Sequence, residues 1–391
     1  MNILFVDNHS KNPFDVQFGS IQRTNLFIQA CANVGHVDLI LFNNEKVESN
    51  IKNCDVIHCK DVTHTQPSKI SEFWRKFKNL IFDKDYFFGA INREKEKIVD
   101  DIISKGNYDF IVTRYIPCAV NCGLPKYGKR LLIDVDDSPV SIKRNVLGVG
   151  ATVFHKWYHQ LMFNKAERLQ TNLLERIGCG FFSNIDDVVP NVSVHLPNIP
   201  FYSKETEYCD FSKTPNNILF VGFVNFSPNL YGLNHFFGKI YPLVKKQIPD
   251  VTVTIVGKCD KSELPDWKDD PSVHVKGFVD DLFAEYEKSK VAIVPIYTGA
   301  GTNIKVLEAF IMKRPCVTTI EGARGYSSIF NENEDYLVCK SDEEFKNGIV
   351  RMIISERDNH NVCFGSFSKV KSNYSKSAFF NIVKKYLINI Q

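Results

Sequence analysis

The sequence predicts an α/β protein made of two doubly wound domains, each with a parallel sheet covered by helices. Its 391 residues are about two to three times the length of an average domain of ~150 residues. Short apolar runs alternate with stretches of helical periodicity, which is typical of βαβ units. A polar stretch at residues 202–216, rich in Ser, Lys, Thr and Glu, interrupts this alternation once, after which it starts again.

The first half of the chain contains apolar runs with the length of buried strands, separated by stretches with helical periodicity. The expected strands are residues 3–6, 37–41, 55–58, 110–113, 131–135, 180–183 and 192–196. The expected helices are residues 21–33, 93–104 and 154–176. Because the polar linker follows, we place the first domain at residues 1–205.

The same alternation fills the second half, and its first two expected strands each end at a glycine, Gly222 and Gly257. The expected strands are residues 217–222, 251–256, 273–275, 291–295 and 316–319. The expected helices are residues 228–247, 280–288, 302–312, 342–355 and 375–390. We place the second domain at residues 206–374 and expect the last helix, about 375–391, to pack back on the first domain. Ligands of such sheets bind at the carboxyl ends of the strands, so we expect the active site in a cleft between the domains.

Composition excludes several classes of protein. A formal net charge of +3 is too balanced for a dedicated nucleic-acid binder. No run approaches the ~18 apolar residues of a membrane span, and the first residues do not have the pattern of a signal peptide. The 11 cysteines have irregular spacing, which is expected of buried thiols in a reducing compartment. We therefore expect a cytoplasmic protein.

Metal and nicotinamide sites are not expected. Asp134, Asp136 and Asp137 follow a strand, but alternate residues of a strand point to opposite faces. His155 and His159 have metal-ligand spacing on a helix, but no third ligand is near them in the sequence. No G-x-G-x-x-G follows the first strand, which argues against a dehydrogenase.

The clearest chemical motif is the segment from residue 294 to 310, in which a strand, a two-glycine loop and a helix follow one another. Gly299 and Gly301 permit close approach of a ligand to the backbone, and Thr302 is a suitable helix N-cap. The N–H groups of Asn303, Ile304 and Lys305 then face the loop with the helix dipole behind them, as in a phosphate site. Glu308 shares a helix face with Lys305 and is placed to accept from ribose hydroxyls. The alternative is a glycine turn beside an ordinary Lys/Glu surface pair.

This segment, with residues 314–319 and 322–325 after it, resembles the C-terminal half of glycosyltransferase family 4. Upstream, residues 220–222, 227–229, 256–257 and 275–281 fall in the family's order. In the first half, residues 19–23 with 35–36 resemble the family's acceptor-side glycine loop and first helix. Residues 133–137 (Ile-Asp-Val-Asp-Asp) resemble its catalytic-cleft strand, and residues 196–198 its segment before the linker.

The resemblance implies the GT-B architecture of two Rossmann-like domains, and transfer of a sugar from a nucleotide donor, UDP- or GDP-linked, with retention and without a metal or other cofactor. The acceptor would be a glycan or a lipid-linked glycan in polysaccharide biosynthesis. By position, Lys305, Glu308 and Asp136 would be catalytic, and Asp136 would orient sugar or acceptor; capping of a strand end is its alternative role. The donor would be bound by the following residues: Gly222, Gly277, Phe278, Val279, Gly301, Thr302, Asn303, Ile304, Lys305, Glu308 and Arg324. The acceptor side would comprise Gly19, Ser20, Asp136 and Asp137.

The chain departs from the family pattern at several positions. Ala300 stands where a second Glu is common, and Phe223 and Pro228 stand near the places of an Arg and a Lys. Lys305, with Arg324, would then be the main cation on the leaving diphosphate. Lys313 replaces a glycine and costs up to about 1 kcal/mol if its φ is positive.

Two further expectations concern partners and alternatives. Residues 73–78 (Phe-Trp-Arg-Lys-Phe-Lys) mix aromatic and basic side chains, which favours either contact with the inner face of a membrane or a solvated amphipathic helix. Because of Ala300 and the missing basic residues, a catalytically silent nucleotide-sugar-binding subunit is an alternative function. A sugar-nucleotide epimerase of the same architecture is another.

Overall fold

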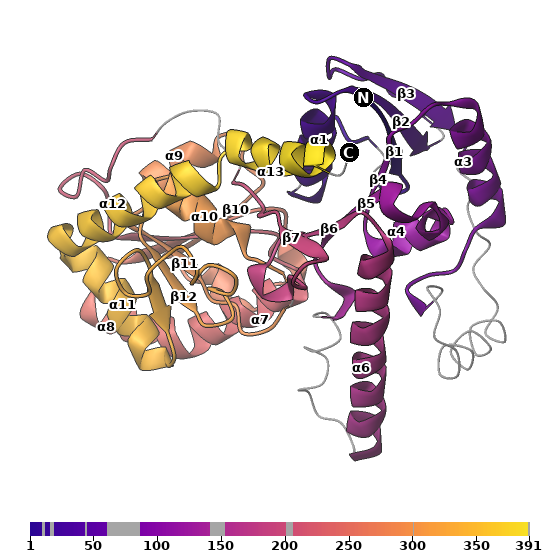
Figure 1. Cartoon of the computed structure of the whole chain (residues 1–391). Helices are drawn as coiled ribbons and strands as arrows, with labels where there is room; N and C mark the ends of the chain where they lie inside the picture. The colour runs from indigo at the N-terminus through magenta and orange to yellow at the C-terminus, as the bar shows by residue number, and fades with distance from the viewer. Residues whose placement is uncertain are drawn as a thin grey trace. The chain divides into compact units, whose positions relative to one another are not determined.

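The computed structural model describes residues 1–9, 12–15, 19–43, 45–60, 87–140, 153–200, 206–299 and 301–389. The chain divides into two compact units. Unit 1 comprises Met1–Pro197 with Lys376–Gln391, and unit 2 comprises Asn198–Ser375. Each unit contains one parallel sheet, which confirms the predicted fold class (Figure 1).

Unit 1 contains a seven-stranded sheet in the order β3-β2-β1-β4-β5-β6-β7, and every pair is parallel. The strands are β1 (Asn2–Asp7), β2 (His36–Phe42), β3 (Cys54–Cys59), β4 (Phe110–Arg114), β5 (Leu131–Asp136), β6 (Cys179–Phe182) and β7 (Ser193–His195). The strand order reverses between β1 and β4, so the carboxyl ends of β1, β4 and β5 form the topological switch point where α/β sheets bind ligands.

The helices of unit 1 come from both ends of the sequence. They are α1 (Gly19–Ala32), α3 (Arg93–Lys105), α4 (Ile116–Asn121), α6 (Val153–Arg176) and α13 (Lys376–Asn389), with 3₁₀ segments at Leu124–Arg130 and Ile185–Asp187. α13 packs beside α1 (Figure 1), with the ring of Phe379 6.2 Å from that of Phe27. Phe379, Val383 and Leu387 are buried because they repeat every four residues on one face of α13.

Unit 2 contains a six-stranded parallel sheet in the order β10-β9-β8-β11-β12-β13. Its strands are β8 (Asn217–Val221), β9 (Thr252–Val256), β10 (Val273–Gly277), β11 (Val291–Val294), β12 (Cys316–Thr319) and β13 (Leu337–Cys339). Because the order reverses between β8 and β11, the switch point of this sheet lies where β8 and β11 end.

The helices of unit 2 are α7 (Ser227–His235), α8 (Tyr241–Gln247), α9 (Leu282–Glu287), α10 (Ile304–Ile311), α11 (Asp342–Ile354) and α12 (Glu356–Asn373). A π segment at Phe236–Ile240 joins α7 to α8, and 3₁₀ segments occupy Lys261–Glu263 and Asp266–Asp269. The single helix predicted at residues 228–247 is therefore a helix with a π segment.

The sequence pattern does not predict α4, α12 or β13, and it predicts the N-cap of α10 one residue too early. The buried face of α12 contains Asn359 and Ser366, so its apolar periodicity is weak; β13 has only three residues. The N-cap of α10 is Asn303, not Thr302, and Asn303 makes no side-chain capping hydrogen bond. Its amide instead donates to the carbonyls of Glu321 and Gly322, which ties the loop before α10 to the loop after β12.

Among the described residues, no helix has both the length and the apolar character needed to cross a membrane.

Candidate functional site

The carboxyl end of β8 in unit 2 is a tight glycine crossing. Gly222 and Gly257 have φ values of 151° and 134°, which disfavour any side chain. A Cβ atom on Gly257 would lie 2.0 Å from the carbonyl oxygen of Gly222. The two backbones therefore touch, and the edge of the sheet presents backbone groups where a ligand can approach them closely.

Lys305 of α10 reaches this glycine edge. A Cβ atom on Gly222 would lie 3.1 Å from Lys305 Nζ. The ammonium group donates to Asn229 Oδ1 at 2.7 Å, and Asn229 Nδ2 donates to the carbonyl of Phe223, also at 2.7 Å. Asn229 therefore connects the predicted cation to the loop after β8. The sequence analysis gave Asn229 no role; its only signal was membership of the Ser-Pro-Asn motif at residues 227–229.

Lys305 and Glu308 have shifted pKa values because both lie in a poorly solvated place. Burial lowers the pKa of Lys305 to about 8, and the nearby Glu308 opposes this shift. Burial raises the pKa of Glu308 to about 7, and Lys305 opposes that shift. Both groups thus titrate close to neutral pH, as is common in sites that bind or transform a ligand.

Arg324 lies at the loop that precedes α10. Its Nη2 donates to the carbonyls of Gly299 and Gly301. On the same loop, Thr302 Oγ1 accepts a 3.4 Å hydrogen bond from Asn198 Nδ2. Arg324 therefore fixes the glycine loop in this conformation, and its guanidinium group lies beside the residues predicted to hold the diphosphate.

The end of β10 carries the residues predicted to border the base. Gly277 ends the strand with φ 75°, Phe278 is 74% exposed, and Val279 is half-buried. Phe223, after β8, is 51% exposed. Exposed aromatic rings at the carboxyl ends of the strands offer stacking surfaces to a planar ligand.

Unit 1 holds a buried charge network at the ends of β4 and β5. Asp134 accepts hydrogen bonds from Arg23 Nη2 at 2.6 Å and from Arg114 Nε at 2.7 Å. Arg114 Nη2 donates to Asp136 Oδ2 at 2.6 Å. Arg23 and Arg114 hold the pKa of Asp134 below its usual range despite complete burial. The sequence indicated Arg23 only as part of a motif and gave no signal for Arg114. The two arginines meet the two carboxylates because of the order of the strands, which the sequence pattern does not show.

Two residues at this edge have unusual backbone conformations. Tyr115 has φ 64° and Asp136 has φ 60°, although neither is glycine. Such conformations cost of order 1–3 kcal/mol and are concentrated at functional sites. The ion pair with Arg114 helps to hold Asp136 in this conformation, and the guanidinium of Arg114 also lies over the ring of Tyr115, 4.6 Å from its centroid.

Asp137 differs from Asp134 because burial, which disfavours the charged form, determines the direction of its pKa shift. Burial raises its pKa to about 6, and the negative charge of Asp136 raises it further, whereas a 3.3 Å hydrogen bond from Ser183 Oγ opposes the shift. The ring of His9 packs 4.8 Å from that of Tyr115 at the same edge. Asp136 is thus a fixed, ion-paired carboxylate, and Asp137 is one that changes charge near neutral pH.

Several predicted features cannot be placed. Gly19 and Ser20 form the first turn of α1, but the described side chains of α1 begin after them. The following lie outside the described residues or side chains: Ala300, residues 73–78, and the side chains of His155 and His159.

Three comparisons relate the chain to known proteins. Residues 215–355 match the family model of group 1 glycosyl transferases. A relative from Klebsiella pneumoniae, described as an uncharacterized 44.6 kDa protein in the cps region, is 22% identical over 389 residues, with 95% of this chain and 97% of the relative covered.

Solved structures share the fold of the whole chain. Sucrose-phosphate synthase from Thermosynechococcus elongatus aligns with a TM-score of 0.67 at 14% identity and covers 98% of each chain. HepE from Anabaena, in complex with UDP, aligns with a TM-score of 0.63 at 12% identity and covers 100% of each chain. The chain therefore has the GT-B fold of glycosyltransferases, as predicted, and its residues 215–355 are similar to the group 1 glycosyl transferases.

Proposed function

We propose that the protein transfers a sugar from a nucleoside-diphosphate donor to a glycan or lipid-linked glycan acceptor, with retention of anomeric configuration. The observation that carries this proposal is the arrangement of Lys305, Glu308 and Gly222 within the family-matched region. UDP in the similar HepE structure favours a UDP-linked donor over a GDP-linked one.

The diphosphate binds in unit 2 between the end of β8 and the start of α10. As the bond between the sugar and the diphosphate breaks, negative charge develops on the leaving oxygen. The ammonium of Lys305 and the N–H groups of Asn303 and Ile304, at the positive end of α10, stabilise that charge. These groups supply the charge stabilisation that a metal ion provides in other enzymes, so we propose a metal-independent reaction.

The nucleoside is held by neighbouring groups. The Glu308 carboxylate accepts hydrogen bonds from the ribose hydroxyls, and Phe278 stacks on the base beside Gly277 and Val279. Gly301 and Thr302 border the diphosphate through their backbone. Arg324 keeps their loop in place and adds positive charge next to it.

The acceptor is held by unit 1. Gly19 and Ser20 lie in the first turn of α1, Asp136 is the last residue of β5, and Asp137 follows it. In the proposed step the acceptor oxygen bonds to the anomeric carbon on the face that the diphosphate leaves. The acceptor proton passes to an oxygen of the departing phosphate. Asp136, fixed by Arg114, orients the sugar or the acceptor.

A role in polysaccharide biosynthesis is favoured by the relative from the cps region. We propose that the protein acts in the cytoplasm, at the inner face of a membrane when its acceptor is lipid-linked. The basic aromatic segment at residues 73–78 motivates the membrane contact.

The test is acceptor-dependent turnover. UDP- and GDP-sugars are incubated with candidate lipid-linked and free glycans, nucleotide release is measured, and NMR coupling at the new anomeric centre reports its configuration. The proposal requires nucleotide release only when acceptor is present, lost in Lys305→Ala, and a product with the donor's configuration. Binding without turnover would support the silent subunit, and a changed sugar without acceptor would support the epimerase.

A further inference from the structure

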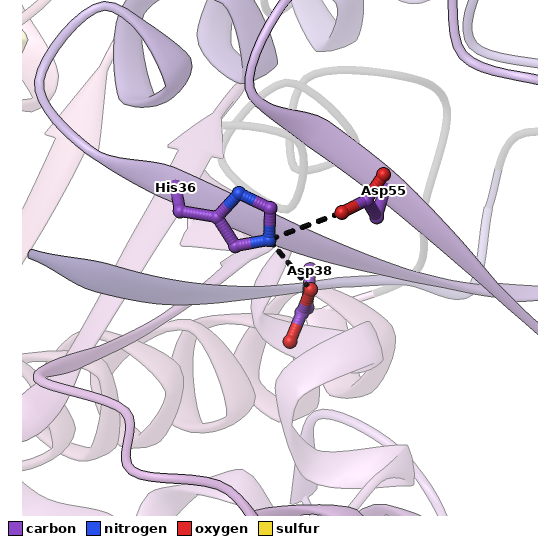
Figure 2. Close-up of side chains that lie close together, drawn as sticks. All are labelled: His36, Asp38 and Asp55. Carbon is purple, nitrogen blue, oxygen red and sulfur yellow. Dashed lines mark hydrogen bonds and ion pairs between the residues drawn. The ribbon is translucent and has the colours of Figure 1, made fainter.

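Three metal-ligating side chains converge at the amino ends of β2 and β3 in unit 1 (Figure 2). His36 is the first residue of β2, and Asp38 follows two positions later on the same face of the strand. Asp55 of β3 is the register partner of Asp38 in the parallel pair. The strand period and the pairing register therefore bring the three side chains together, at the sheet edge opposite the carboxyl ends that carry Asp136.

The two distances from the imidazole to the carboxylates match those between neighbouring ligands of a metal ion. His36 Nε2 lies 3.2 Å from Asp38 Oδ1 and 3.3 Å from Asp55 Oδ2, and the three potential ligand atoms all lie within 4.8 Å of one another. Metal–ligand bonds of about 2.0–2.1 Å in a tetrahedron place neighbouring ligand atoms about 3.3 Å apart. A single imidazole N–H, by contrast, cannot align well with two carboxylates at once.

The negative charges of the two carboxylates favour a bound cation. Asp38 and Asp55 are like charges at directly paired positions, an arrangement that destabilises a sheet. A divalent ion bound between them compensates for both charges. One imidazole nitrogen with two carboxylate oxygens suits zinc and similar divalent transition ions better than a site made of oxygen ligands alone.

A second group orients the ligands. Tyr108 Oη donates to Asp38 Oδ2 at 2.6 Å, which leaves Oδ1 for the ion. The backbone of His36 is also anchored, because its N–H donates to the carbonyl of Met1 at 2.9 Å. Partners of this kind commonly tune the affinity of metal sites.

We propose that His36, Asp38 and Asp55 bind one divalent transition-metal ion, with water completing its coordination. The side chains of His36 and Asp55 are 45% and 78% exposed, so an ion and its water can reach them from solvent. The bound ion links the edge strand β3 to β2 through its ligands. This inference does not depend on the proposed transferase activity.

The test is calorimetric titration of the full, tag-free chain with Zn²⁺, together with thermal unfolding. We expect saturable one-to-one binding that raises the melting temperature. His36→Gln should weaken binding at least tenfold, and Asp55→Asn should weaken it too. The matched control is His235→Gln, because His235 pairs with a single carboxylate, Asp342, at 2.7 Å; this variant should bind Zn²⁺ like the wild type.

Two further measurements distinguish this site from others. Tyr108→Phe keeps all three ligands and should weaken binding about tenfold, the effect expected for an orienting partner. Co²⁺ in place of Zn²⁺ should give a spectrum without the sulfur-to-cobalt charge-transfer band that cysteine ligands produce. Absence of saturable binding, or binding unchanged in His36→Gln, would overturn the proposal and leave an ordinary ion-paired histidine.

Discussion

Lys305 and Glu308 lie one turn apart on α10, and their pKa values lie close together, at about 8 and about 7. A poorly solvated lysine at this position is suited to binding a diphosphate. In the proposed donor complex, the bound anion would replace the lost solvation of the ammonium, so the pKa of Lys305 would rise when the donor binds. The carboxylate of Glu308 would likewise gain hydrogen-bond donors from the ribose.

Nucleotide affinity should therefore depend on pH in a bell-shaped manner. Binding weakens as pH rises above about 8, because Lys305 loses its proton, and as pH falls below about 7, because Glu308 gains one. Each limb approaches a tenfold change per pH unit. Titration calorimetry with UDP between pH 5.5 and 9.5, values chosen to span about 1.5 units beyond each pKa, measures it. Lys305→Arg, which stays charged, should lose only the alkaline limb; two unchanged limbs in this variant would contradict the assignment.

Asp137 gives a second residue-scale prediction, about stability. Its folded pKa of about 6 exceeds the ordinary value of 3.8, so its charged form destabilises the fold at pH 7. Asp137→Asn should raise the free energy of unfolding at pH 7 by up to about 3 kcal/mol. The advantage should shrink as pH falls through 6 and vanish at about pH 3 and below, where wild-type Asp137 is protonated in both the folded and the unfolded state. Urea unfolding at several pH values checks this, and a pH-independent difference would refute it.

Residue types and spacing indicated Lys305 and Glu308 of α10 as candidate site residues, but not their electrostatic state. Burial at Lys305 and Glu308 depends on the way α10 packs against the ends of β8 and β11. The network of Arg23, Arg114 and Asp134 likewise needs three elements that only the strand order brings together. Those residues are far apart in the sequence, and no spacing rule connects them.

At the scale of elements, the end of α10 shows a strained residue held by its contacts. Lys313 has φ 51°, the positive value that the sequence analysis considered for this position. Arg314 N–H donates to Ala309 O at 2.9 Å, and Lys313 N–H to Phe310 O at 3.1 Å, which is a Schellman ending. Lys313 Nζ lies 4.8 Å from the ring centroid of Tyr208 and 4.7 Å from that of Phe367.

The contacts and the backbone strain of Lys313 predict that the glycine variant at this position is more stable than the alanine variant. Lys313→Ala loses both cation–π contacts and keeps the backbone strain, so it should destabilise the protein by about 1–2 kcal/mol. Lys313→Gly loses the same contacts but relieves the strain, so it should be about 1 kcal/mol more stable than the alanine variant. Denaturant unfolding of both variants measures the difference, and an alanine variant as stable as the glycine variant would contradict it.

Most strands and helices could be predicted because apolar runs and helical periodicity mark buried elements directly. The exceptions have physical causes. α12 buries Asn359, whose amide donates to the carbonyls of Lys290 and Met352, so a polar residue occupies a core position. The start of α10 differs from the prediction because its N-cap is Asn303. The side chain of Asn303 hydrogen-bonds to the neighbouring loop and does not cap the helix.

At the scale of the whole molecule, the last helix belongs to the first unit. Phe379 is 1% exposed and packs against Phe27, far away in the sequence. Phe379→Ala should therefore destabilise unit 1 by about 3–5 kcal/mol. Hydrogen exchange should accelerate in α1. The control is Ile388→Ala, because the side chain of Ile388 on the same helix is 45% exposed. This variant should change stability by less than about 1 kcal/mol. Equal effects of the two variants would contradict the packing.

The two-sheet architecture could be predicted from the restart of the alternating pattern at residue 217. The order of strands within each sheet could not be, because parallel neighbours are selected by crossover connections rather than by the strands' own residues. The strand order determines where the candidate site of unit 2 forms, because it brings the ends of β8 and β9 and the start of α10 together.

The most direct test of the account is titration of the protein with UDP, GDP and ADP, for the wild type and for Glu308→Ala. The control is Glu287→Ala, an exposed glutamate of the same unit. We predict that one nucleoside diphosphate binds the wild type and the control, stabilising them by about 2.7 kcal/mol at 100 times its Kd, and that Glu308→Ala loses this effect. Binding of none of the three, or binding undiminished in Glu308→Ala, would contradict the assignment of the donor site.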